Sequence, residues 1–216
     1  MDSSHLSRLA GMIEPVAVAD FAGAVCRWLQ DAHEAAADLQ PLRRHHHRGA
    51  WHNNTSFGTD RHQYLRNTAA SLSADLPDLQ VDSDFQSVLL RLPRAGIYQF
   101  QQPGGPEGSL GDTSELRREL LTTGDPHALF SRRDALLAGR AMLLLSWSGT
   151  EEHGLTGASI GQGELVDNHV EWQWLLSLTE LGGDRALPVH FGPDIFTQPQ
   201  PELPIRPRTE RQADTS

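Results

Sequence analysis

The hydrophobic residues of this chain recur at helical spacing in its first third. In residues 15–38, large apolar side chains return every three or four positions, which predicts one amphipathic helix beginning near Pro15. Pro41 and a run of arginines and histidines then interrupt the pattern, so we expect a mobile loop over residues 40–56. A second helix is predicted to follow Thr59, which suits an N-cap position.

The spacing changes to a strand pattern from residue 87 onward. Apolar residues alternate on both sides of a turn at residues 93–96, which predicts a hairpin over residues 87–101. Residues 141–147 are almost all apolar, as in a central strand, and an antiparallel pair is predicted within residues 155–178, joined near Asp167. Two short helices are predicted between these sheet regions.

These elements predict an α+β fold, in which an antiparallel sheet of about five strands packs against helices. We expect a single domain over residues 12–190, preceded by a flexible N-terminus at residues 1–11. Residues 191–216 are rich in proline and poor in large apolar groups, so burial cannot offset the entropy of ordering them. We therefore expect a disordered C-terminal tail.

The composition excludes several kinds of chemistry. All 18 basic residues are arginine, so a Schiff-base lysine and a P-loop lysine are both ruled out. The absence of lysine beside abundant alanine, arginine and glycine is typical of a GC-rich coding bias, as in actinobacteria. The formal net charge of −10 opposes nonspecific binding to nucleic acid, which depends on clustered cations.

The chain lacks the usual signs of export. Its single cysteine, Cys26, excludes an internal disulfide and is expected to be a small core residue. The segment from Met1 to Arg8 does not resemble a signal peptide, and no apolar run approaches the roughly 18 residues that would span a bilayer. We therefore expect a cytoplasmic protein with no membrane partner.

Histidines supply the main candidates for a metal site. Zinc or another divalent metal bound there would indicate a metal-dependent hydrolase or nuclease. Against this, consecutive histidines on a loop do not converge on one ion, and neighbouring arginines repel a cation. We expect no cofactor and keep the metal site as an alternative. Its candidate ligands are His45, His46, His47, His52, His62, Asp82 and Asp84.

The arginines beside these histidines suggest another alternative. Arg43, Arg44 and Arg48 could contact phosphates, which would make the chain a nucleic-acid-associated protein with affinity that falls steeply as salt is added. The net acidity of the chain disfavours this hypothesis. We keep binding to nucleic acid as an alternative to the favoured hypothesis of a protein partner.

A serine motif and an acidic turn are candidates for catalytic residues, but neither predicts an active site. Residues 157–161 match the G-x-S-x-G nucleophile elbow, which needs a strand before the serine and a helix after it. The residues that follow have a strand pattern, so we expect these glycines to relieve crowding in a twisted strand. Residues 151–153, Glu-Glu-His, are expected to form a solvated turn.

Two tryptophans form the most concentrated aromatic feature of the chain. Trp172 and Trp174 are two residues apart in a predicted strand, so they are predicted to share one face. If that face packs on the helices it is core, which we favour. If it is exposed, it is a surface for a protein partner, because tryptophan is enriched among interface anchors.

Several segments together resemble an uncharacterised actinobacterial protein family, over about residues 57–180. The resemblance implies a setting in regulatory or stress and defence modules, because genes for helix-turn-helix regulators or metallopeptidases often neighbour those of such proteins. It assigns no catalytic residue. The segments that carry it are Phe57–Arg61, Leu116–Leu120, Leu143–Trp147 leading into Gly154, and Gly161–Leu165.

We therefore favour the hypothesis of a non-enzymatic regulatory or protein-interaction protein, in which an α+β domain presents a surface to another protein. It rests on the lack of a convincing catalytic pattern, on the acidic charge and on the tryptophan pair.

Overall fold

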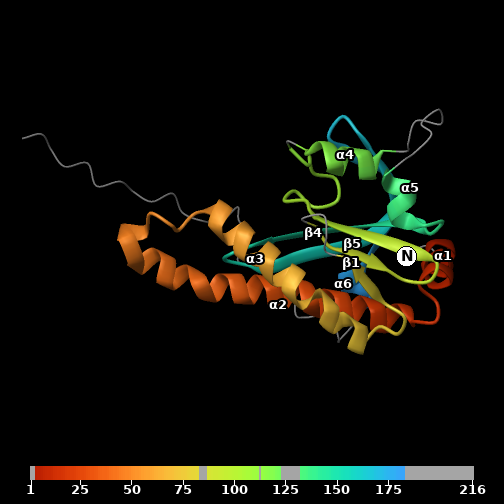
Figure 1. Ribbon diagram of the computed structural model, residues 1–216, viewed down its shortest axis with the longest axis horizontal. Coiled ribbons are helices and arrows are strands. Elements are labelled where there is room, and N and C mark those ends of the chain that lie inside the picture. The colour runs from red at the N-terminus through yellow and green to blue at the C-terminus, as the bar shows by residue number, and fades with distance from the viewer. Residues whose placement is uncertain (1–2, 83–86, 112, 123–131, 183–216) are drawn as a thin grey trace, which may run out of the picture.

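The computed structural model describes residues 3–82, 87–111, 113–122 and 132–182 (Figure 1). The predicted tail at residues 191–216 lies outside them. The helices are α1 (Ser3–Ile13), α2 (Val18–His45), α3 (Asn54–Thr68), α4 (Glu115–Leu121), α5 (Arg132–Leu137) and α6 (Leu178–Leu181), with short 3-10 helices η1 (His46–Gly49) and η2 (Ala69–Ala74). The strands are β1 (Gln80–Asp82), β2 (Leu89–Arg91), β3 (Ala95–Gln101), β4 (Ala141–Thr150), β5 (Gly154–Val166) and β6 (His169–Ser177).

The described strands form one sheet in which each strand lies beside its neighbour in sequence, from β1 to β6. All pairs are antiparallel except β3 and β4, which run parallel from Ala95 opposite Ala141 to Gln101 opposite Trp147. Parallel neighbours need a long crossover connection, and the segment that contains α4 and α5 supplies it. The α+β class is confirmed, but the antiparallel sheet of about five strands is wrong: the sheet is mixed and has six.

Both predicted hairpins are present. Strands β2 and β3 pair with Leu90 opposite Ile97, as the alternating pattern over residues 87–101 indicated. Strands β5 and β6 are joined by Asp167 and Asn168, whose φ angles of 47° and 64° are those of a type I′ turn. Local sequence was sufficient in both places because a tight turn determines which residues pair.

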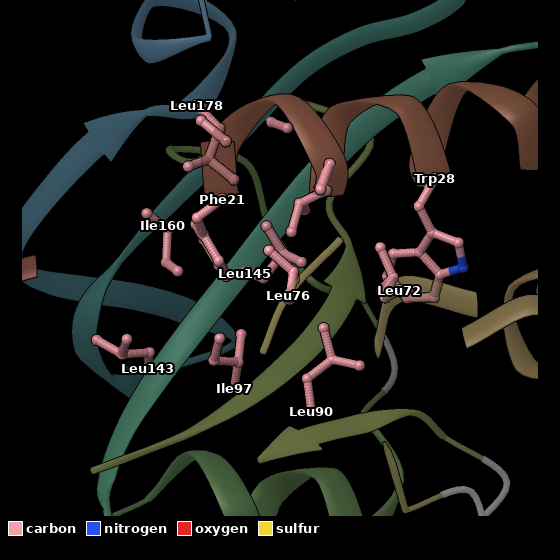
Figure 2. Close-up of a cluster of buried hydrophobic side chains, with 14 of the residues drawn as sticks. Phe21, Trp28, Leu72, Leu76, Leu90, Ile97, Leu143, Leu145, Ile160 and Leu178 are labelled. Carbon is pink, nitrogen blue, oxygen red and sulfur yellow. The ribbon is translucent and has the colours of Figure 1, made fainter. Parts of the chain in front are cut away.

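Helices cover both faces of the sheet. Helix α2 lies along one face, and α4 and α5 lie on the opposite face (Figure 1). Figure 2 shows the core beneath α2, where side chains from the helix, from η2 and from the strands interdigitate. A second apolar cluster, which includes Tyr98 and Phe100 of β3, packs against Leu120 of α4 and Leu137 of α5. The alternation of side chains along β3 thus contributes to both cores.

Helix α2 extends well past its predicted end near residue 38, so the expected mobile loop at residues 40–56 is largely helical. Proline inside a helix costs about 3 kcal/mol, yet α2 continues through Pro41 to His45. Contacts with α3 favour the extension, because Arg43 Nη2 donates to Asp60 Oδ1 at 2.6 Å. Helix α3 begins at Asn54, earlier than predicted, since Asn53 and Ser56 form a capping box.

The N-terminal segment also differs from expectation. Residues 1–11 were expected to be flexible, but α1 occupies residues 3–13 and buries Leu9 and Ile13 completely. These two side chains lie one helical turn apart, on one face of a short amphipathic helix.

Candidate functional site

A cavity of about 570 Å³ lies between α3, the C-terminal half of β3 and α4. Helix α3 contributes residues from Thr55 to His62, and α4 contributes Arg117 and its N-cap Ser114. Its volume is typical of a ligand pocket. The residues that line the cavity come from segments far apart in sequence, and they include the buried arginine Arg61.

The wall formed by β3 is the part of that strand that extends past its pairing with β2. Strand β2 pairs with β3 only as far as Leu89 opposite Tyr98, whereas β3 continues to Gln101. Among the residues that the structure describes, no strand pairs with residues 99–101 on the side away from β4. Residues 98–101 line the cavity together with Ser87, which lies beyond the end of β2. Gln99 and Phe100 are nevertheless only 4% and 1% exposed, so little of this wall is accessible.

Arg61 of α3 is the central charged group of the site. Arg61 is only 2% exposed. Its guanidinium donates through Nη1 to His33 Nε2 at 2.9 Å and to the Gly149 carbonyl at 3.4 Å. Nη2 donates to Gln101 Oε1 at the end of β3. The Gly149 carbonyl and the Gln101 amide are neutral acceptors.

His33 of α2 is held as the neutral imidazole. Arginine can only donate, so His33 Nε2 accepts, and the proton on Nδ1 is donated to the Leu29 carbonyl at 2.8 Å. Burial, with a smaller contribution from the charge of Arg61, lowers the pKa of His33 to about 4. The histidine therefore serves as a fixed acceptor for Arg61 at neutral pH.

Aromatic rings complete the surroundings of the guanidinium. The Arg61 Cζ atom lies 4.5 Å from the centre of the Trp147 ring and 5.0 Å from that of Phe57. The Trp147 indole is fixed in turn, because Nε1 donates to Gln99 Oε1 at 2.7 Å. These cation–π contacts stabilise a buried cation without neutralising it.

The charge of Arg61 has no counter-ion in the described part of the chain. None of its carboxylates lies within ion-pair distance of Arg61, although buried charges are usually paired. The buried Nε atom of Arg61 also has no hydrogen-bond partner among the described residues. Burial accordingly lowers the pKa of Arg61 to about 10, which still leaves it protonated at neutral pH.

Two glycines have opposite roles at this site. A Cβ atom at Gly149 would lie 2.2 Å from His33 Nε2, so close packing of β4 against the histidine requires glycine there. A Cβ atom at Gly58, in α3 and at the cavity, would have no neighbouring atom within 4 Å. Glycine weakens a helix interior by about 1 kcal/mol relative to alanine, so at Gly58 packing does not account for its presence.

The opposite wall contributes a second cation. Arg117 of α4 is half-buried, and its Nε donates to the Tyr98 hydroxyl at 3.4 Å. Arg61, Arg117 and His62 all line the cavity, and its described lining contains no carboxylate. The cavity is thus basic in a chain whose formal charge is −10.

The predicted metal ligands do not come together where they can be described. His52 Nε2 lies 3.1 Å from Glu151 Oε2, Asp82 accepts from Arg91 Nη2 at 2.6 Å, and His62 lines the cavity. His45 and His46 are at the far end of α2, while the side chain of His47 and all of Asp84 lie outside the described residues. In the described part of the chain, no three His, Cys, Asp or Glu residues form a group that could bind a metal.

Two of the predicted phosphate-binding arginines take part in ion pairs within the protein. Arg43 pairs with Asp60, and Arg44 Nη1 donates to Glu151 Oε1 at 2.8 Å. The side chain of Arg48 lies outside the described residues. Glu151 is in the turn between β4 and β5, so this turn, expected to be solvated, connects the sheet to the far end of α2.

The tryptophan pair does not share a face, contrary to prediction. A β-bulge opposite Gln162 and Gly163 inserts an extra residue between the two tryptophans, which reverses the direction of one relative to the other. Trp174 belongs to the core beneath α2, and its Nε1 donates to Gln162 Oε1 at 2.9 Å. Trp172 is half-buried against the second apolar cluster and donates to the Pro106 carbonyl at 2.8 Å.

The serine motif and the cysteine are structural. Residues 157–161 lie within β5, and a Cβ atom at Gly161 would lie 2.1 Å from the Trp174 carbonyl oxygen. The expectation that the glycines relieve crowding is confirmed there. Cys26 is buried, and burial raises the pKa of its thiol to about 12, so it carries no thiolate at neutral pH.

Sequence reasoning did not find Arg61, His33 or Arg117. Phe57 and Arg61 are four residues apart in α3, which is the spacing of side chains on one helical face. The resemblance included both the segment 57–61 and the segment 143–147, but nothing in the sequence indicated that Trp147 would meet Arg61. Only the sheet topology brings them together.

Comparisons with known proteins add no assignment: no family model, curated protein or solved structure matches the chain. Within the described residues, no single helix has the length and apolar character to cross a membrane, and α1 with α2 meets that test only as a pair bent by 78°.

Proposed function

We propose that this chain is a non-enzymatic binding protein of a regulatory or stress-response module, and that its cavity receives an anionic group of a protein partner. The observation that carries the proposal is Arg61, a buried guanidinium at a cavity without a described counter-ion. An anion in the cavity would supply the missing charge and could accept from Nε, which has no described partner.

Preorganisation supports binding. His33, Gln101 and the two aromatic rings hold the guanidinium in place before any ligand arrives. Little side-chain entropy therefore remains to be lost on binding, which raises affinity. The same contacts favour recognition over catalysis, because Nε2 of His33 is already engaged with Arg61 and the pKa of His33 is lowered to about 4.

The test is thermal unfolding with acetate or phosphate, against chloride at equal ionic strength. A dissociation constant near 10 mM would stabilise the protein by about 1.4 kcal/mol at 100 mM anion, or roughly 3–6 °C for a domain of this size. Arg117→Gln should reduce the shift, whereas Arg118→Gln, the same charge change at an exposed neighbour outside the cavity, should retain it. Equal shifts in chloride, or in both variants, would contradict the proposal.

A further inference from the structure

We infer that residues 194–196, Asp-Ile-Phe, bind back to an exposed apolar patch at the far end of α2. Helix α2 projects there from the body of the molecule (Figure 1). Apolar side chains that are exposed together, rather than scattered singly, mark an interaction site. The inference concerns a surface other than the Arg61 cavity, and it does not depend on the proposed function.

The apolar patch is formed by Leu39, Leu42 and Trp51. The two leucines are three residues apart in α2 and so share a helical face, and the tryptophan follows η1. The three residues are 43%, 58% and 59% exposed, and all of them line one hollow of about 380 Å³. Among the residues that the structure describes, Val166 is the only other large apolar residue that is exposed. The exposed apolar surface is therefore concentrated at one place.

The size of the apolar patch favours a tethered segment over a separate partner. A stable interface between two proteins takes about 20–30 residues a side, and three apolar side chains are far fewer. A segment of the same chain has an effective concentration near millimolar, so a dissociation constant of about 1 mM suffices to occupy the patch half of the time. A second copy is also disfavoured by the formal charge of −10 on each chain, because like charges repel.

The chain beyond α6 is long enough to reach the apolar patch. Leu178 of α6 lies beside Phe21, near the start of α2 (Figure 2). From Phe21 to Leu42 the helix rises about 32 Å, at roughly 1.5 Å per residue. From Gly182 to Ile195 the chain can span about 43 Å when extended. Residue 195 can therefore lie on the patch without strain in the connection.

Charge and apolar content select residues 194–196. Two adjacent large apolar residues, Ile-Phe at 195–196, directly follow Asp194. The described lining of the hollow adds Arg43 and His46 to the apolar patch and contains no carboxylate. Arg43 bonds Asp60 through Nη2, but a guanidinium has five N–H donors and can bond a second carboxylate. An acidic residue beside the two apolar side chains therefore complements the patch.

Other apolar residues beyond α6 fit the patch less well. Phe191 is separated from Gly182 by only about 30 Å of extended chain, which is too short to reach the far end of α2. Leu203 and Ile205 are within reach, but Arg206 follows them directly and would be repelled by the cationic rim of the hollow. The expectation of a disordered tail is thus refined, because one short segment of it is held.

The experiment is fluorine NMR of the full chain labelled with 5-fluorotryptophan, in which relaxation of each signal by a soluble paramagnetic probe measures the exposure of that ring. The double variant Ile195→Ser/Phe196→Ser should raise the relaxation of the Trp51 signal at least twofold, because loss of the segment uncovers the ring. The matched control Leu203→Ser/Ile205→Ser makes the same apolar-to-polar change in the same tail and should leave the Trp51 signal as it is in the original protein.

Three results would overturn the inference. The first is equal relaxation of the Trp51 signal in the original protein and in Ile195→Ser/Phe196→Ser. The second is an equal increase in both double variants. The third is loss of protection on dilution, which would identify a second copy as the occupant, because binding within one chain does not depend on concentration. Trp51→Phe assigns the signal, and the signal of Trp147, which is buried, should stay constant if the fold is retained.

Discussion

The open space beside Gly58 leads to a prediction about stability. Gly58→Ala places a methyl group where no atom lies within 4 Å, so it introduces no clash. Alanine is favoured over glycine in a helix interior by about 1 kcal/mol, and the variant should therefore gain about that much in free energy of unfolding. This corresponds to roughly 2–4 °C in melting temperature. The measurement is urea denaturation, in which the midpoint should rise without a change in slope.

Gly11→Ala is the matched control, because Gly11 also lies in a helix and an added Cβ there also meets no atom within 4 Å. Both variants should be stabilised, but a larger side chain at Gly58 should also block the cavity. Gly58→Leu is therefore expected to remain folded and to lose the acetate effect, whereas Gly11→Leu should retain it. A loss of stability in Gly58→Ala with a gain in Gly11→Ala would refute the claim that the space is open.

Three further predictions concern other parts of the fold. Between pH 6.5 and 4, the unfolded chain takes up a proton at His33 while the folded protein does not, so the free energy of unfolding should fall by about 3 kcal/mol because of this residue. His33→Gln should flatten that part of the curve of unfolding free energy against pH. An unchanged curve would contradict a lowered pKa for His33. Gly161→Ala should destabilise by about 1–3 kcal/mol in urea denaturation, because its Cβ would lie 2.1 Å from the Trp174 oxygen, whereas Gly157→Ala, whose Cβ has its nearest contact at 3.4 Å, should have a smaller effect. Pro41→Ala should raise the free energy of unfolding by up to about 3 kcal/mol, and the urea midpoint with it. A lower midpoint would contradict a continuous α2.

Local pattern explains the successful structural predictions. The hairpin over residues 87–101 and the turn at Asp167 and Asn168 depend on residues that are close in sequence. Helix boundaries were less predictable, because local and tertiary terms compete there. Pro41 disfavours helix, but the ion pair between Arg43 and Asp60 forms only after α2 and α3 have packed together.

Two errors had a common origin in the sheet. The alternation that placed Trp172 and Trp174 on one face assumes an unbroken strand, and a single bulge reverses it. Likewise, the apolar pattern of residues 141–147 identifies a central strand without indicating its direction. The parallel pairing of β3 with β4 follows from the path of the intervening helices, which periodicity does not contain.

The sequence by itself determined the α+β class, the two hairpins and the chemistry that an arginine-only, single-cysteine chain excludes. Tertiary structure alone decided the candidate site. His33, Arg61, Gln101 and Trp147 come from four separate elements, and their meeting depends on how those elements pack around the sheet. Local periodicity reports which face of an element is buried, but it contains no information about which distant side chains share that burial.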